Sequence, residues 1–399
     1  MADRRGWLVV VAYAAVAGAT QMLWLTFAPI TTGSAAHYQV SVDAIGWLAQ
    51  VFPLVYVVLA IPAGVLLDRW FRPVLAAGAL LAAAGGAARL IGDSFTWALL
   101  GQVLVAVAQP LVLNAVTKLA SEYLPEASRP AGIAAGSAGI FVGMLVALLM
   151  GPLMSGSFTG LLLAQAAAAV VAAAALVALL RRPGPAAAVV ENLGLSAIRK
   201  VLGDPFIRVL AALVFVGFGA FIGLITWLQA LLAPAGVSDV AAGGLLIAMV
   251  VAGVIGSAIL PALVARRGWE RLMIGASVVV AGVGCVVLGF VPLVAVDAIV
   301  LVLIGALLLA DLPVVLELTE RQAGAAGGSA AALMWLSGNL GGLVVALAVQ
   351  ALIGRPLLAF LAMAAITALG LPLVLFAYPS GWALVSSQGR TTVVPPRAT

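Results

Sequence analysis

The chain contains apolar stretches of about 20 residues or more along most of its 399 residues, separated by short charged loops. The hydrocarbon core of a bilayer, roughly 30 Å thick, is crossed by about 20 apolar residues in a helix. Only 8% of the residues are charged, against about 25% in an ordinary globular domain. Too little polar surface remains for a soluble fold, so the sequence predicts an all-α membrane protein.

The apolar stretches predict twelve transmembrane helices. The first six are expected over residues 7–30, 43–67, 73–92, 95–120, 131–153 and 158–180. The last six are expected over residues 206–232, 240–264, 270–291, 294–316, 325–350 and 355–378. The charged N-terminus leads into a first span that we expect to be retained rather than cleaved as a signal peptide.

The spans predict a division of the chain into two halves. A six-helix bundle is expected over residues 1–181, a cytoplasmic linker over 182–205, a second six-helix bundle over 206–380, and a flexible cytoplasmic tail over 381–399.

The distribution of basic residues predicts the orientation in the membrane. Only Arg89 and Arg355 fall near the side opposite the termini. The side of the termini holds Arg4, Arg5, Arg69, Arg72, Lys118, Arg129, Arg181, Arg182, Arg199, Lys200, Arg208, Arg266, Arg267, Arg271, Arg321, Arg390 and Arg397. Basic loops remain in the cytoplasm, so we expect a multi-pass protein of the cell (inner) membrane with both termini cytoplasmic. This asymmetry also accounts for the net charge of +5 without a nucleic-acid partner.

The two halves repeat each other at a nearly constant offset. Residues 61–63, which precede Trp70 and Arg72, align with residues 260–262, which precede Trp269 and Arg271. Further matches join 110–113 to 313–316 and 136–139 to 338–341, so the offset stays at about 199 to 203 residues. The sequence therefore predicts two pseudo-symmetric bundles, an arrangement known from parallel-repeat transporters.

The loop after the second span carries a recognisable motif, formed by Gly64, Asp68, Arg69 and Arg72. It resembles the G-x-x-x-D-R/K-x-x-R/K loop of the major facilitator superfamily. The resemblance implies that fold, and a cytoplasmic gate in which the carboxylate of Asp68 pairs with an arginine or a helix end. In the second half Arg267 stands in the place of Asp68, so we expect an asymmetric gate.

Three further stretches resemble the feline leukaemia virus subgroup C receptor family and its prokaryotic relatives. They are residues 21–29, 102–118 and 317–339. The resemblance implies transport of choline-like cations, or of haem. The chain has Asn339 where the family often has Gln, and Phe221 or Ile222 where it often has Tyr.

The candidate substrate-binding residues are polar or aromatic side chains on helices that line the cavity in this superfamily. They are Gln21, Trp24, Gln109, Asn114, Thr226, Trp227 and Asn339. Interfacial anchoring is an alternative role for the two tryptophans, and interhelical hydrogen bonding is one for Gln109. The middle of the cavity helices lacks Arg and Lys, which favours a cationic or neutral substrate over an anion.

Asp311 is the most costly residue of the predicted spans, because a carboxylate inside a membrane helix needs water, a partner or a substrate. Three roles remain open: proton coupling, attraction of a cationic substrate, and a structural ion pair.

The residue pattern indicates a transporter and not an enzyme. With one cysteine, Cys285, and one histidine, His37, we expect neither a metal site nor a cofactor. The expected protein is a monomer in the lipid bilayer that moves a small organic solute by alternating access, as a secondary-active or facilitative transporter. Two alternatives are a proton-coupled multidrug or metabolite exporter, and a non-transporting sensor or receptor on the same fold.

Overall fold

The computed structural model describes residues 2–125, 128–154, 156–182, 184, 201–323, 327–377, 384–387 and 390–393. Within these residues, twelve helices are long and apolar enough to cross a membrane, which confirms the predicted all-α membrane fold. The contacts divide the chain into two compact units, Met1–Asn192 with Thr226–Ile247, and Leu193–Ile225 with Ala248–Thr399. Two helices therefore belong to both units, since the chain passes from the second unit to the first at Thr226 and returns to the second at Ala248.

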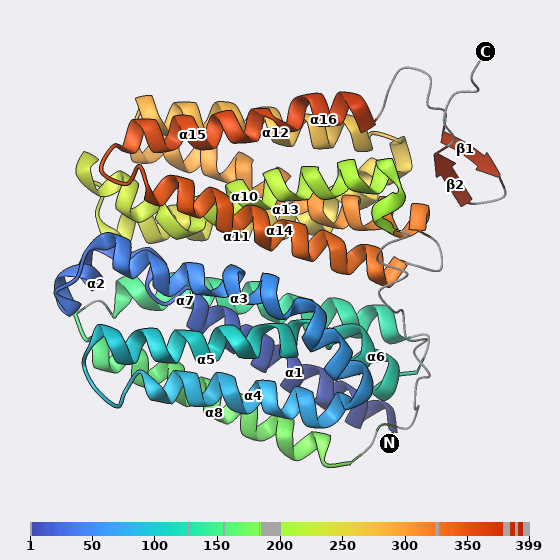
Figure 1. The fold of residues 1–399 in the computed structure, drawn as a ribbon, viewed down its shortest axis with the longest axis horizontal. Helices are drawn as coiled ribbons and strands as arrows, with labels where there is room; N and C mark the ends of the chain where they lie inside the picture. Colours follow the sequence, from blue (N-terminus) through green and yellow to red (C-terminus); the bar gives the residue numbers. More distant parts are fainter. Residues whose placement is uncertain are drawn as a thin grey trace. The chain divides into compact units, whose positions relative to one another are not determined.

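The first unit begins with a broken span and ends with parts of two later helices (Figure 1). Its own elements are α1 (Ala2–Trp24), η1 (Ala28–Ile30), α2 (Thr31–Tyr38), α3 (Val42–Arg69), α4 (Phe71–Ala88), α5 (Phe95–Leu113), α6 (Val116–Tyr123), α7 (Arg129–Leu153) and α8 (Phe158–Leu180).

The second half of the chain is also helical, with one small hairpin near its end. Its elements are α10 (Pro205–Leu232), η3 (Ala233–Ala235), α11 (Asp239–Arg267), α12 (Glu270–Phe290), α13 (Val294–Ala323), α14 (Gly327–Gln350), α15 (Pro356–Ala368), α16 (Gly370–Ala377), β1 (Leu384–Ser387) and β2 (Arg390–Val393). The two strands pair antiparallel, with Leu384 opposite Val393.

The first span is longer and less regular than predicted. A single helix over 7–30 was expected, but α1 ends at Trp24 and the chain continues through η1 and α2 to Tyr38. The hydroxyl of Thr26 donates 2.9 Å to the carbonyl of Leu23 and also lies 2.7 Å from Oε1 of Gln165. A hydroxyl that bonds to nearby carbonyls offers the backbone an alternative to the helix, which accounts for the break.

The fourth span is also shorter than its predicted range of 95–120. Helix α5 ends at Leu113, and a separate helix, α6, begins at Val116. Pro110 lacks the N–H that a continuous helix would use, and the side chain of Asn114 bonds to α3 instead of its own helix. The break is therefore fixed by a contact between helices.

Small residues bring helix pairs into close contact in each unit. In the first unit α1 packs along α7, and a Cβ atom on Gly143 would collide with the carbonyl of Gly18. In the second unit a Cβ atom on Gly341 of α14 would collide with the carbonyl of Phe215 of α10. Lipid tails are as apolar as leucine, so close packing of this kind contributes more to helix association in a membrane than apolar burial does.

Helix α2 holds the single histidine at one end of the first unit. The imidazole Nε2 of His37 lies 2.8 Å from Oδ1 of Asp93, and the ring stacks on Phe158 at a centroid distance of 4.1 Å. These contacts tie α2 to the loop after α4 and to the start of α8.

Candidate functional site

The aromatic candidate Trp24 lies where three helices of the first unit meet. Its indole Nε1 donates 2.9 Å to the carbonyl of Ala49 in α3, and its ring lies 5.9 Å from that of Phe52. The amide of Gln102 in α5 donates 3.0 Å to the carbonyl of Leu48 and lies 3.4 Å from the carbonyl of Trp24. The end of α1 is thereby held by side chains against α3 and α5, and Trp24 is only 7% exposed.

The two glutamine candidates differ in whether their amides have a hydrogen-bond partner. Gln21 is buried one turn before Trp24, and its Nε2 lies 3.4 Å from the hydroxyl of Thr20. Gln109 in α5 is 4% exposed, and its amide forms no hydrogen bond with the residues that the structure describes. Its amide atoms are not among the fully enclosed polar atoms, so the amide of Gln109 is open to a hydrogen bond from water or a ligand.

Asn114, by contrast, is fully engaged by neighbouring residues. Its Oδ1 accepts a 2.7 Å hydrogen bond from the hydroxyl of Tyr56, and its Nδ2 donates 3.2 Å to the carbonyl of Ala60. Both partners belong to α3. This asparagine therefore ties the end of α5 to α3.

The second aromatic candidate contacts the same helix as the first. Trp227 belongs to the part of α10 within the first unit and is fully buried. The tip of its indole lies so close to Gly46 of α3 that a Cβ atom there would collide with it. Trp24 and Trp227 thus pack against successive turns of one helix, between Gly46 and Phe52, while Thr226 is buried beside Trp227.

The remaining two candidates belong to the second unit. The amide Nδ2 of Asn339 donates 2.9 Å to the carbonyl of Trp335, within its own helix α14. Asp311 in α13 has one carboxylate oxygen in contact with the hydroxyl of Ser277 in α12, and its other oxygen, Oδ1, is buried without a described partner.

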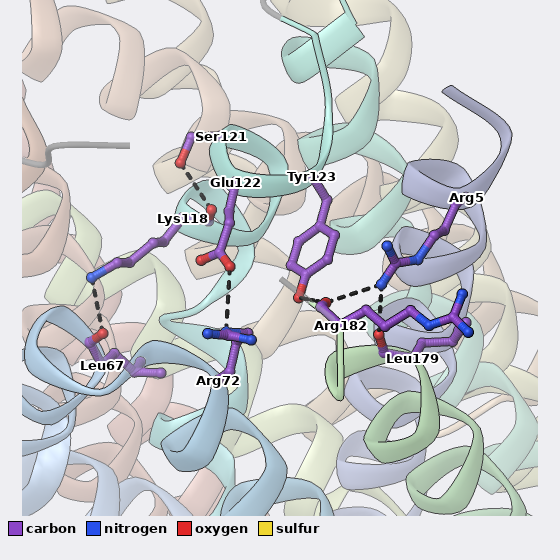
Figure 2. Close-up of polar contacts among 9 residues, drawn as sticks. All are labelled: Arg5, Leu67, Arg72, Lys118, Ser121, Glu122, Tyr123, Leu179 and Arg182. Carbon is purple, nitrogen blue, oxygen red and sulfur yellow. Dashed lines mark hydrogen bonds and ion pairs between the residues drawn. The ribbon is translucent and has the colours of Figure 1, made fainter. Parts of the chain in front are cut away.

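A cluster of charged residues forms the basic end of the first unit, defined here by Arg5, Arg72, Lys118, Glu122 and Arg182 (Figure 2). The ammonium of Lys118 donates 2.9 Å to the carbonyl of Leu67, in the last turn of α3. Nε of Arg72 lies 3.7 Å from Oε1 of Glu122. A cation at a helix C-terminus satisfies free carbonyls and interacts favourably with the helix dipole.

The structure describes the surroundings of three of the four motif residues at this end. Gly64 has open space around it, and the guanidinium of Arg69 lies over the ring of Trp70 at 4.5 Å. Arg72 forms the ion pair with Glu122. The side chain of Asp68 lies outside the described part of the chain, so its expected pairing remains a prediction.

Tyr123 connects the end of α6 to the residues just after α8. Its hydroxyl donates 3.2 Å to the carbonyl of Arg182, which also accepts 3.0 Å from the guanidinium of Arg5. Burial, followed by the charge of Glu122, raises the pKa of Tyr123 to about 12. The phenol is therefore a neutral hydrogen-bond donor at physiological pH.

Several polar residues of the structure were not among the sequence candidates. Ser277 and Gln165 are ordinary polar residues in apolar helices, and their partners Asp311 and Thr26 come from other helices. Arg89 donates 2.9 Å to the hydroxyl of Thr26 and 3.3 Å to Oε1 of Gln165. In the sequence, Arg89 is one of only two basic residues near the side opposite the termini. This unusual position was the sequence signal that its side chain has a partner.

These features define the class of the protein as a multi-pass helical membrane protein. A family model described as Major Facilitator Superfamily matches residues 9–346, most of the chain. The chain therefore belongs to the major facilitator superfamily.

Relatives in sequence come from the same superfamily. The chain is 29% identical over 373 residues to Solute carrier family 49 member A3 of Danio rerio, covering 88% of this chain and 79% of that protein. It is 27% identical over 158 residues to the Choline/ethanolamine transporter FLVCR2 of Homo sapiens, covering 38% of this chain and 30% of that protein. The second similarity supports the predicted resemblance to the feline leukaemia virus subgroup C receptor branch.

Solved structures confirm the fold. A POT family peptide transporter superposes with a TM-score of 0.74 at 14% identity, covering 94% of this chain and 96% of that chain. A bacterial homologue of the human lysosomal transporter Spinster superposes with a TM-score of 0.69 at 17% identity, covering 94% of both chains.

Proposed function

We propose that this protein moves a small organic solute across the membrane by alternating access, and that the solute is a choline-like cation or a neutral molecule. The observation that carries the proposal is the side chain of Gln109, which is 4% exposed and forms no hydrogen bond with the described residues, while its amide atoms are not among those fully enclosed by protein. A relative over part of the chain is named a choline/ethanolamine transporter, which supports the same class of substrate.

Aromatic residues along α3 support a cationic substrate. Phe52 belongs to this helix and Trp24 and Trp227 pack against it; all three side chains are buried, and Trp24 is 7% exposed. An aromatic face attracts a quaternary ammonium group with up to about 2 kcal/mol when water is excluded. The candidate substrate residues include neither lysine nor arginine, so they offer no charge that would favour an anion.

We assign the candidate residues to three roles. Trp24 and Trp227 contribute aromatic surface, Gln21 and Gln109 contribute amides, and Asp311 supplies negative charge or accepts a proton. The remaining polar contacts are assigned to Asn114, Thr226 and Asn339.

The proposal extends to the placement of the protein. We place it in the cell membrane as a monomer with both termini in the cytoplasm. The basic end of the first unit then faces the cytoplasm and forms the gate together with Gly64, Asp68, Arg69 and Arg72.

Counterflow in proteoliposomes tests this function. Vesicles loaded with unlabelled choline should accumulate labelled choline transiently, and vesicles loaded with an organic anion of similar size should not. Counterflow of an anion alone would contradict the proposed substrate class. Binding without counterflow of any solute would favour a sensor or receptor, whereas extrusion of diverse hydrophobic amines would favour the exporter.

A further inference from the structure

The carboxyl group of Asp311 and the hydroxyl of Ser277 are in direct contact within the second unit. Asp311 lies on α13, and Ser277 is fully buried on α12. Beside them is a cavity of about 30 Å³, with room for about one or two water molecules. Oδ1 of Asp311 is buried and unpartnered among the described residues, so half of the carboxyl group is unsatisfied.

A count of hydrogens shows that this contact depends on protonation. The hydroxyl of Ser277 has a single hydrogen, but two acceptors lie within reach: the carbonyl of Ile274 at 2.9 Å and Oδ2 of Asp311. If Asp311 is ionised, Ser277 can satisfy only one of them. If Asp311 carries a proton, its own O–H donates to Ser277, and the hydroxyl of Ser277 then donates to Ile274. The protonated form therefore satisfies Oδ2 of Asp311, the hydroxyl of Ser277 and the carbonyl of Ile274, and it leaves Oδ1 as an uncharged carbonyl oxygen.

The surroundings do not supply another charge that could take the place of the proton. The cavity is lined by residues of α10, α12, α13 and α15, and those from the other three helices are uncharged and cannot titrate. They are mainly apolar, such as Leu213 and Phe218 of α10, and the polar ones are Ser277 and Thr367. The hydroxyl of Thr367 donates 2.7 Å to the carbonyl of Met363 in its own helix.

We propose that Asp311 and Ser277 form a proton-binding site inside the second unit, and that this proton is the coupling ion of the transport proposed above. The proton arrives as hydronium through water in the cavity and binds to the carboxylate of Asp311, which leaves a neutral water molecule behind. At the same time the hydroxyl of Ser277 turns from Oδ2 of Asp311 to the carbonyl of Ile274. Loss of the proton reverses the direction of the hydrogen bond that joins α13 to α12 and leaves a bare carboxylate that must recruit water.

Infrared spectroscopy of the purified protein tests the site without requiring transport. Lowering the pH should produce a carbonyl stretch of a protonated carboxylic acid that is lost in Asp311→Asn and retained in Asp297→Asn. Asp297 is the matched control because it is a second buried carboxyl group on α13, does not line this cavity and can give a separate band of its own. Ser277→Ala should shift the Asp311 band to higher frequency, since the acid loses its acceptor. A pH-difference spectrum that Asp311→Asn leaves unchanged, or an Asp311 band that Ser277→Ala leaves in place, would overturn the proposal.

Coupling is then measured in proteoliposomes. Asp311→Asn should lose accumulation driven by a proton gradient, so that the solute reaches only its equilibrium distribution. Gradient-driven accumulation that persists in Asp311→Asn would overturn the coupling role. If the infrared band behaves as expected and no solute is transported by the unmodified protein, the proton site stands and the proposed transport function fails.

Discussion

The indole N–H of Trp24 donates a hydrogen bond of 2.9 Å to the backbone carbonyl of Ala49. The bond fixes the last residue of α1 to the N-terminal third of α3 and sets the orientation of the aromatic ring. Two contributions of Trp24 can therefore be separated: the hydrogen bond, which only tryptophan makes, and the aromatic face, which phenylalanine also has.

Substitution of Trp24 tests the aromatic contribution to binding. Trp24→Phe should lose the hydrogen bond, at about 0.5–1.5 kcal/mol of stability, and should keep most of the affinity for a quaternary amine. Trp24→Ala should lose the face as well, and the half-saturation concentration should rise about 5- to 30-fold. Uptake of labelled choline measures both variants. Equal affinity of the two variants and the unmodified protein would assign Trp24 to packing alone.

Gln109 in α5 and Asn114 just after it form a matched pair of amide side chains for testing the proposed binding site. Gln109→Ala should raise the half-saturation concentration about 5- to 30-fold with little loss of stability, because its amide has no described protein partner. Asn114→Ala should lower thermal stability, since the hydroxyl of Tyr56 loses its acceptor. Binding and melting curves of both variants distinguish the roles. Reversed behaviour would place the binding amide at Asn114.

The carboxylate of Asp68, in the loop motif at the basic end, should control closure of the proposed cytoplasmic gate. Asp68→Asn should weaken the gate and reduce transport more strongly than it reduces the amount of protein in the membrane. The control is Asp43→Asn, which makes the same change in the first turn of the same helix, α3. Transport rates normalised to surface expression decide the result, and a normal rate in Asp68→Asn would remove this residue from the gate.

The orientation of the protein can be tested by cysteine labelling. Ala36 in α2 and Arg266 in α11 are both exposed, and the native Cys285 is fully buried, so it should not react. An impermeant thiol reagent should label Ala36→Cys in intact cells and Arg266→Cys only after permeabilisation. The opposite pattern would reverse the proposed topology.

The folding stability of the protein should depend on the hydrogen bond between the buried guanidinium of Arg89 and Gln165. Burial lowers the pKa of Arg89 from 12.5 to about 10, so the side chain is charged at neutral pH. Gln165→Leu removes one hydrogen-bond acceptor of the charged guanidinium and should lower the free energy of unfolding by about 1.5–3 kcal/mol. The same substitution should cost much less in an Arg89→Met background, which a double-mutant cycle of unfolding free energies measures.

The lowered pKa of Arg89 also determines how its contribution to stability depends on pH. The native state binds this proton less tightly than the unfolded chain, so any gain in stability appears only as the pH rises from about 10 towards 12.5. The contribution of Arg89 should therefore be constant near neutral pH. A stability difference between the unmodified protein and Arg89→Met that varies between about pH 6 and 8 would contradict this assignment.

The amino-acid sequence by itself determined the membrane fold, the twelve spans and the superfamily. Each span requires about 20 consecutive apolar residues, which is a local property of the chain. The half-chain repeat and the motif from Gly64 to Arg72 are likewise visible in the order of residues.

The tertiary structure decided where helices break and which polar groups meet. The break after Trp24 brings Thr26 to Gln165, 139 residues further along the chain, and the break at Asn114 depends on Tyr56, 58 residues earlier. Ser277 became a partner of Asp311 only through the packing of α12 against α13. A polar side chain in an apolar helix must find a partner, but the sequence does not say which helix provides it, because that depends on how the helices pack.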